Sequence, residues 1–206
     1  MTISKMSKLL WCPVDLPKFP SKFSITTEKN WKFWNIANLT NTPEGNVYQK
    51  NKIKEEISKK YPELMEWLSL FPIKSIRNFK FNIQTSSVAT HIDFRNKEED
   101  EELFMNNNEN EPCGFRILLQ GRRENCLYMK NDRYGKKIYC TMPDDTDVYV
   151  LRHTDGWHGT EEDLDRQTMF LHIEVDPEKH QELLAKSLTK YGKYAVYAPS
   201  LPEFNK

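Results

Sequence analysis

The sequence is poor in several features that mark particular protein classes. It has seven glycines, and its four cysteines (Cys12, Cys113, Cys126 and Cys140) include no CxxC pair, so free thiols in a reducing cytosol are expected. No apolar run approaches the ~18 residues of a membrane-spanning helix, and the N-terminus lacks the apolar core of a signal peptide. Basic and acidic residues number 30 each, for a net charge of zero. We therefore expect a cytoplasmic protein that does not enter a membrane and for which nucleic acid is a disfavoured partner.

The length of 206 residues is that of a single domain, residues 1–206. Residues 1–75 are predicted to form an irregular segment followed by helices that pack on the core. Residues 76–176 are predicted to form a β-rich core. Residues 177–206 are predicted to form a closing helix and a tail.

Two helical regions flank the core. Apolar residues recur at helical spacing between residues 47 and 70, and Pro62 suits a first helical turn. The closing helix is predicted to begin at Pro177, with Asp176 as its N-cap and Gly192 as its stop.

The middle of the chain changes to an alternation with a period of two, which is typical of strands. The strand-like runs are 77–84, 115–120, 125–130, 136–141, 147–152 and 166–175. They are joined mostly by short polar turns, and residues 131–135 have the pattern of a hairpin loop. The sequence thus predicts a mainly β protein, a sandwich or a barrel, with flanking helices.

An acidic run interrupts these strands. Residues 96–113 contain seven acidic residues and one lysine. Most such runs are solvated loops, and the alternative is a lid, because long loops beside a rigid barrel often carry function. As a lid, this run would favour a cationic substrate through its charge.

The chain has five histidines, and His91 is followed two residues later by Asp93, just past a strand-like run. Alternation would place His91 and Asp93 on the same face, where an imidazole nitrogen and a carboxylate oxygen can converge on one cation. A second histidine would complete the two-histidine, one-carboxylate set that leaves open positions on non-haem Fe(II). His158, which follows the strand-like run 147–152, is favoured as that ligand, and His153 is the alternative.

The last strand-like run has two distinct faces. One face is apolar, and the other begins with Arg166 and Thr168. An arginine that points into a barrel needs an anionic partner, because burial of an unpaired guanidinium is costly. Its planar fork binds a carboxylate at two points, and Thr168 can add a hydroxyl donor. The alternative is a surface ion pair between Arg166 and Asp163 or Asp165.

Several of these stretches, within residues 76–176, are similar to motifs of one enzyme family. They are the HxD motif at 91–93, Phe115-Arg116-Ile117-Leu118-Leu119, Asp147-Val148-Tyr149-Val150 leading to Trp157-His158-Gly159, and the closing strand from Arg166. In this order they resemble the iron(II)/2-oxoglutarate-dependent dioxygenases, and among these the aspartyl/asparaginyl β-hydroxylase-like group.

The resemblance implies a double-stranded β-helix, which is a jelly roll or cupin-like barrel. It implies that Fe(II) is held by three ligands, His91, Asp93 and His158. The co-substrate 2-oxoglutarate would chelate the iron, and its distal carboxylate would pair with Arg166 and Thr168. Arg116 is a further candidate contact to the co-substrate. With dioxygen, the enzyme would hydroxylate an amino-acid side chain, free or within a peptide, and release succinate and CO₂.

Two other classes of function fit parts of this pattern. A non-catalytic, cupin-like protein that binds a metal or a small molecule would need no carboxylate-binding arginine. A hydrolase or isomerase with Zn²⁺ or Mn²⁺ on the same ligands would need no oxygen. Basic pairs at Arg122-Arg123 and Lys136-Lys137 leave a nucleic-acid substrate as a remote third reading.

Overall fold

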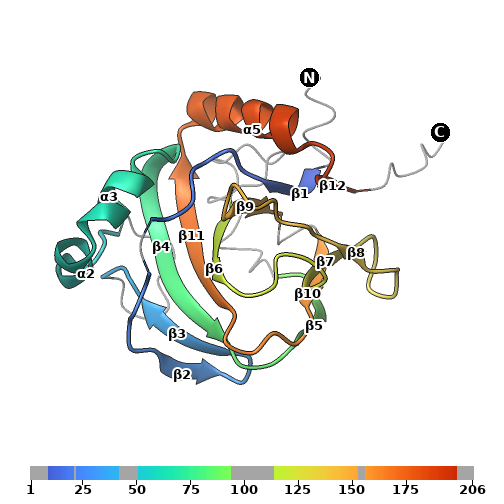
Figure 1. Cartoon of the computed structure of the whole chain (residues 1–206), viewed down its shortest axis with the longest axis horizontal. Coiled ribbons are helices and arrows are strands. Elements are labelled where there is room, and N and C mark those ends of the chain that lie inside the picture. Colours follow the sequence, from blue (N-terminus) through green and yellow to red (C-terminus); the bar gives the residue numbers. More distant parts are fainter. Residues whose placement is uncertain (1–8, 21, 42–50, 94–113, 153–155, 199–206) are drawn as a thin grey trace, which may run out of the picture.

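Two antiparallel sheets form the body of the protein. The computed structural model describes residues 9–20, 22–41, 51–93, 114–152 and 156–198. The larger sheet has the strand order β12 (Val196–Tyr197), β1 (Leu9–Pro13), β9 (Val148–Leu151), β6 (Gly114–Gln120), β11 (Gln167–Val175), β4 (Ile73–Gln84), β3 (Trp34–Asn38) and β2 (Glu28–Trp31). The smaller sheet has the order β5 (Val88–His91), β10 (Trp157–Thr160), β7 (Leu127–Lys130) and β8 (Ile138–Tyr139). The larger sheet curves through the molecule, and the smaller sheet lies beside β6 and β9 (Figure 1).

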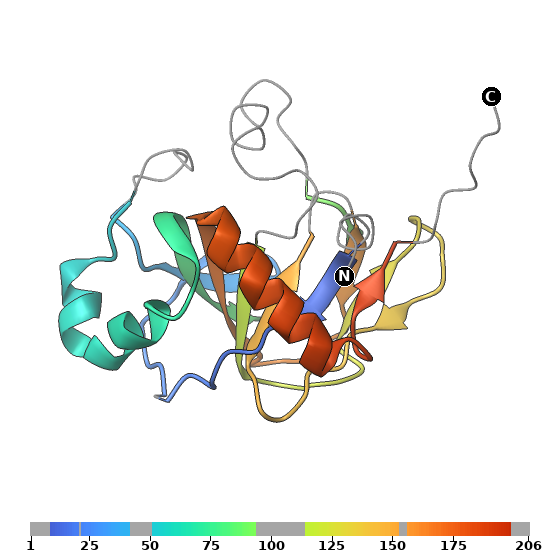
Figure 2. The ribbon, with the colours of Figure 1, turned by 90° about the horizontal axis from the view of Figure 1, so that it is seen from above.

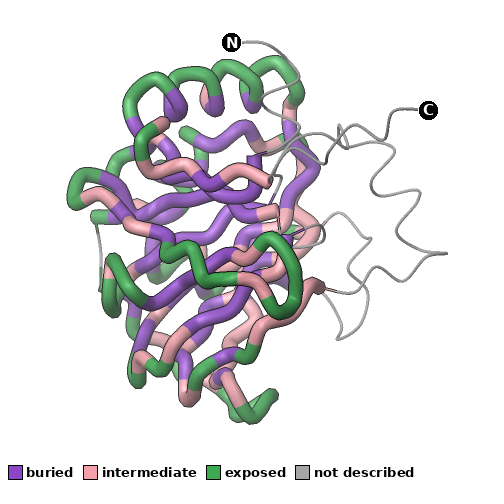
Figure 3. Tube along the Cα trace, turned by 90° about the vertical axis from the view of Figure 1, so that its right-hand side faces the viewer, coloured by how far each residue is buried: buried purple, intermediate pink, exposed green. Residues whose placement is uncertain are grey.

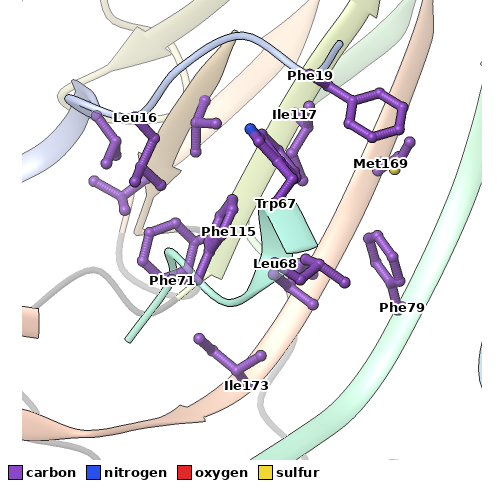
Figure 4. Packing of buried hydrophobic residues seen from close by; sticks show 14 of the residues in the cluster. Leu16, Phe19, Trp67, Leu68, Phe71, Phe79, Phe115, Ile117, Met169 and Ile173 are labelled. Atoms are coloured by element: carbon purple, nitrogen blue, oxygen red, sulfur yellow. The ribbon is translucent and has the colours of Figure 1, made fainter. Parts of the chain in front are cut away.

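Helices cover the outer face of the larger sheet. They are α2 (Glu55–Lys60), α3 (Pro62–Leu68) and α5 (Pro177–Tyr191), and α5 runs across the molecule in front of the strands in Figure 2. Trp67 and Leu68 of α3 pack with Phe79, Phe115 and other strand residues in one buried cluster (Figure 4). This cluster takes up the apolar face of β4, β6 and β11, so the opposite face of these strands is left to meet the smaller sheet.

The helix signals in the sequence are largely confirmed. Pro62 opens α3, and Pro177 opens α5, with the carboxylate of Asp176 accepting from the backbone N–H of Lys179. Gly192 is the C-cap of α5. The single helical stretch expected up to residue 70 is instead two short helices, because Tyr61 between them has a non-helical backbone, with φ −130° and ψ 66°. No described helix combines the length and the apolar character needed to cross a bilayer.

The expectation of an irregular start was wrong for much of residues 1–46. Strand β1, whose five residues are all buried, pairs with β9, and β3 pairs with β4. Strand β12 also joins the sheet within what was predicted as a tail. These segments are too short or too irregular in pattern to read as strands alone, and they become strands because a neighbouring edge offers backbone partners.

The β-rich middle is confirmed, with two additions. The six expected runs correspond to β4, β6, β7, β8, β9 and β11, and residues 131–135 form the loop between β7 and β8. The additions are β5 and β10, each four residues long. The acidic run at 96–113 lies outside the described residues.

The two sheets face each other across an interior that is apolar in one part and polar along β4 and β11. Leu127 and Met129 of the smaller sheet share a buried cluster with Leu118 and Tyr149 of the larger sheet, so the two sheets face each other there. Residues on this inner face become more exposed along β11, from Arg166 and Thr168, which are buried, to Phe170 and His172, which are half-buried. The same change runs along β4, from buried Gln84 and Asn82 to half-buried Lys80 and Asn78. We call the Arg166 end the closed end and the His172 end the open end. Figure 3 shows how buried and exposed residues are distributed along the strands.

Candidate metal centre

The two histidines of the candidate site lie opposite each other on paired strands. His91 is the last residue of β5, and His158 is its cross-strand partner on β10. Their ring centroids are 4.4 Å apart. His158 is buried, whereas the side chains of His91 and Asp93 are half-exposed. The pairing of two short strands thus brings together two residues that are far apart in the sequence.

Backbone carbonyls fix the orientation of both imidazoles. Nδ1 of His91 lies 2.8 Å from the carbonyl oxygen of Ala89, and Nδ1 of His158 lies 2.9 Å from that of Gly156. A carbonyl oxygen only accepts, so each Nδ1 carries the proton and donates it. Each Nε2 is therefore the nitrogen that is available to a metal ion, in the arrangement by which proteins orient histidine ligands.

Asp93 adds a carboxylate to the pair. Its Oδ1 lies 3.4 Å from Nε2 of His91. This hydrogen bond to Asp93 raises the pKa of His91, against the lowering effect of burial. A proton and a metal ion would compete for Nε2 of His91 beside this carboxylate, because a histidine binds a metal in its neutral form.

Together the three side chains form a group that could hold a metal ion. One ligand atom from each of His91, Asp93 and His158 lies within 4.8 Å of the others. Two imidazoles and one carboxylate are the donor set of non-haem Fe(II) sites and also suit Zn²⁺. The structure thus brings His91, Asp93 and His158 together, and their role as metal ligands stays a prediction. The alternative, His153, lies outside the described residues.

Gly159 lets β5 and β10 approach closely behind this group. A Cβ at residue 159 would lie 2.7 Å from the carbonyl oxygen of Val88 and would also meet the hydroxyl and Cζ of Tyr128. The hydroxyl of Tyr128 is in turn 3.1 Å from that of Thr90 on β5. The absence of a side chain at 159 thus permits the close pairing that places His158 beside His91.

Arg166 is buried at the closed end, with 3% of its surface exposed. Tyr149 of β9 interacts with its side chain. The Nε of Arg166 has no hydrogen-bond partner among the residues that the structure describes. The surface reading of this arginine is therefore wrong, and the interior placement predicted from the alternation of the strand is confirmed. A guanidinium this deeply buried calls for an anion.

Other buried polar atoms near Arg166 also lack partners. Thr168 and Asn82 are directly opposite on β11 and β4, and both face inward. Within the described part of the chain, the buried atoms without a partner include Thr168 Oγ1, Asn82 Nδ2, Thr160 Oγ1 and Gln84 Oε1. A buried polar atom without a partner is uncommon and requires an explanation. We call Arg166, Thr168, Asn82 and Thr160 the closed-end polar group, since each can donate a hydrogen bond to a bound ligand.

Arg116 lies on the same inner face as Arg166 but at another level. It is opposite Phe170 on β11, and its guanidinium stacks on that ring at 4.0 Å from the centroid. Phe170 is four residues beyond Arg166, or about 13 Å along the strand at ~3.3 Å per residue. A contact between Arg116 and a co-substrate stays a prediction.

The metal-binding group lies between the closed and open ends. Gln84 connects the two sheets at the closed end. Its backbone N–H donates to the carbonyl oxygen of Arg166, and its side-chain Nε2 donates to the carbonyl oxygen of Glu161, both at a distance of 2.9 Å. His158 is three residues before Glu161, which places it about 10 Å from that end. A small molecule between His158 and Arg166 would span this interval.

Sequence reasoning missed Asn82, Thr160 and Tyr149 as parts of the site. Nothing in a single sequence reveals which residues of neighbouring strands share a level, and only the strand register places Asn82 opposite Thr168. A comparison of the chain with protein-family models and with curated proteins gives no match.

Proposed function

We propose that this protein is an Fe(II)- and 2-oxoglutarate-dependent dioxygenase that hydroxylates an amino-acid side chain, free or within a peptide. The observation that carries the proposal is the closed-end polar group, which is buried between the sheets in a protein that also has a two-histidine, one-carboxylate group. A site for the metal alone would need no buried arginine. A co-substrate that binds the metal at one end and carries a carboxylate at the other explains both features.

Each residue has a definite task in this proposal. The iron ligands are His91, Asp93 and His158, with both imidazoles held in the required tautomer by backbone carbonyls. When bound, iron and 2-oxoglutarate supply, with dioxygen, an oxidant that replaces a C–H hydrogen by a hydroxyl group and yields succinate and CO₂. The protein orients the substrates and excludes water.

The closed-end polar group would bind the distal carboxylate of 2-oxoglutarate. Arg166 provides a planar fork for two-point contact, and Tyr149 holds that fork in place. Thr168 and Asn82 add one donor each from adjacent strands. Leu118, Leu127 and other members of the inner apolar cluster keep the surroundings dry, which strengthens such charge interactions.

The double-stranded β-helix also belongs to this proposal. Two facing antiparallel sheets with an inward-facing metal-binding group are what such a barrel presents. A hydrolase with Zn²⁺ on the same ligands would leave the unpartnered donors at the closed end without a role, so we favour the oxygenase.

The test is succinate formation from 2-oxoglutarate with Fe(II) and dioxygen. We expect turnover by the wild type, a loss of about 100-fold or more in Asp93→Ala, and no loss in the matched control Asp144→Ala, whose side chain is 98% exposed. Arg166→Gln should raise the 2-oxoglutarate concentration required far more than the Fe(II) concentration. Equal succinate formation by wild type and Asp93→Ala would refute the proposal.

A further inference from the structure

The closed end holds a positive charge that the protein cannot remove. Arg166 is 3% exposed, and burial of a cation without a counter-ion is costly. A buried lysine can respond to this cost by losing its proton. An arginine cannot, because its guanidinium stays protonated in proteins. The charge of Arg166 therefore calls for an anion.

Acidic side chains around the closed end are bonded to other cations. Asp163, whose charge acts on Arg166, accepts from the backbone N–H of Arg122 at 2.8 Å and lies 3.8 Å from the Arg122 Nε. Glu161 is paired with Lys137. In the part of the chain that the structure describes, Arg166 forms no ion pair of its own. This leaves its counter-ion to be supplied by a ligand.

The unpartnered atoms around this charge comprise donors and one acceptor. The atoms that can donate are Nε of Arg166, Nδ2 of Asn82 and the hydroxyls of Thr160 and Thr168. The atom that can only accept is Oε1 of Gln84. These five residues are each at most 7% exposed, so water at the protein surface does not satisfy them. A ligand that matches the closed end must therefore accept several hydrogen bonds and donate one.

The hydrogen bonds of Gln84 fix which of its amide atoms is left unbonded. Its Nε2 donates to the carbonyl oxygen of Glu161 at 2.9 Å. A carbonyl oxygen only accepts, so the amide cannot be turned around without loss of this bond. The backbone N–H of Gln84 donates to Arg166, and Glu161 directly follows Thr160. The acceptor Oε1 thus belongs to the same end of the interior as the donors.

We propose that the closed end binds inorganic phosphate when metal and co-substrate are absent. Phosphate keeps at least one proton near neutral pH, so its oxygens accept from the four donors while its O–H donates to Oε1 of Gln84. Sulfate has the same tetrahedral shape but no proton, and chloride and acetate also only accept. Phosphate uses the donors assigned to the co-substrate carboxylate, so the two ligands compete. Only this competition rests on the proposed function, and phosphate binding itself does not.

Calorimetry of the metal-free protein in EDTA tests the proposal. Phosphate and sulfate are titrated separately in the same chloride background, which keeps the screening of charges equal. We expect one phosphate per chain, bound about tenfold tighter than sulfate because of the additional hydrogen bond to a charged ligand. In the Mn²⁺-loaded protein, phosphate should raise the apparent dissociation constant for 2-oxoglutarate. Absent phosphate binding, or equal affinities for phosphate and sulfate, would overturn the inference.

Variants separate the buried charge from the acceptor. Arg166→Gln should weaken the binding of both anions about tenfold or more. Thr168→Val should weaken both and keep the phosphate-to-sulfate ratio. Gln84→Met, which has a similar length and no acceptor oxygen, should reduce that ratio to about twofold or less. The exposed control Arg133→Gln should match the wild type.

Gln84→Met also loses the bond to Glu161, so circular dichroism must confirm that it folds. If it does not fold, the wild-type ratio and Arg166→Gln still decide the question. Undiminished phosphate binding by Arg166→Gln would place the anion elsewhere and overturn the inference. Failure of the oxygenase proposal would appear separately, as absent succinate formation with phosphate binding intact.

Discussion

Single buried polar side chains distinguish a candidate binding site from a hydrophobic core in the interior of this protein. Thr168 is fully buried, and its hydroxyl has no partner, so its presence weakens the apo protein unless a ligand uses it. The alternation along residues 166–175 was enough to place Thr168 and Arg166 on one inward face. It could not reveal Asn82 or Tyr149 as their neighbours, because strand alternation carries no information on which strands pair.

Thr168→Val tests the role of this hydroxyl. Valine has nearly the same shape and needs no partner, so the free energy of unfolding of the apo protein should stay the same or rise. The hydrogen bond to a charged ligand would be lost, and the dissociation constant for 2-oxoglutarate should rise about tenfold. Chemical denaturation and calorimetry measure the two effects. A clear loss of apo stability with unchanged affinity would mean that the hydroxyl is structural.

Gly159→Ala tests the contact between the two histidine-bearing strands. The added methyl group meets the Val88 carbonyl and Tyr128, so β10 must move away from β5. The affinity for Mn²⁺ should fall about tenfold or more. In the matched control Gly135→Ala, the nearest atom is a flexible Asp132 oxygen at 3.2 Å, and the affinity should stay within twofold. Equal affinities in both variants would contradict the geometry described for β5 and β10.

Secondary-structure elements were predictable where their patterns are long. The alternation in β4 and β11 and the Pro177 signal of α5 each reflect a local preference that the fold keeps. Strands β5 and β10 are four residues each, too short for a pattern, and they exist because they pair with each other and because β10 also pairs with β7. The candidate site depends on these two short strands. The sequence therefore indicated the site through its candidate ligand residues and not through the strands that carry them.

Asp15 ties α5 to the segment after β1. Its carboxylate pairs with Lys190 at 2.8 Å and Lys186 at 3.0 Å. The bond from Lys190 lowers the pKa of Asp15 below 3.8, burial opposes this, and Lys186 adds to the lowering. A carboxyl group with a lowered pKa in the folded state stabilises the protein above its unfolded-state pKa and loses that effect as the pH falls through the folded value.

Asp15→Asn should therefore destabilise the protein at pH 7 by about 1 kcal/mol or less, because the lysines are largely exposed. The difference from the wild type should disappear well below pH 3.8. Urea unfolding at both pH values measures it, with Asp144→Asn as the control. A destabilisation that persists unchanged at low pH would show that packing, and not charge, fixes α5.

At the scale of the whole molecule, the fold joins two sheets around a polar interior. The class, mainly β with flanking helices, followed from the order of the sequence patterns. The strand order did not, since β12, β1 and β9 pair across most of the length of the chain, and such pairing depends on the complete sheet. That the barrel is a double-stranded β-helix remains part of the proposal.

Metal binding should stabilise the whole domain, because the unfolded chain has no assembled ligand set. At a metal concentration of 100 times the dissociation constant the gain is about 2.7 kcal/mol, which corresponds to a rise in Tm of roughly 5–10 °C for a protein of this size. Thermal unfolding with Mn²⁺ should show the rise, and EDTA should reverse it. His91→Ala should show none, and an equal rise in that variant would place the metal elsewhere.

The central claim is that His91, Asp93 and His158 hold one divalent metal ion. Calorimetric titration of the metal-free protein with Fe(II) in the absence of oxygen tests it most directly, with the three single alanine variants and Asp144→Ala beside the wild type. We expect one bound ion per chain in the wild type and in Asp144→Ala, and binding weakened about 100-fold or more in each of the other variants. One ion bound with undiminished affinity in any of the three ligand variants would contradict it.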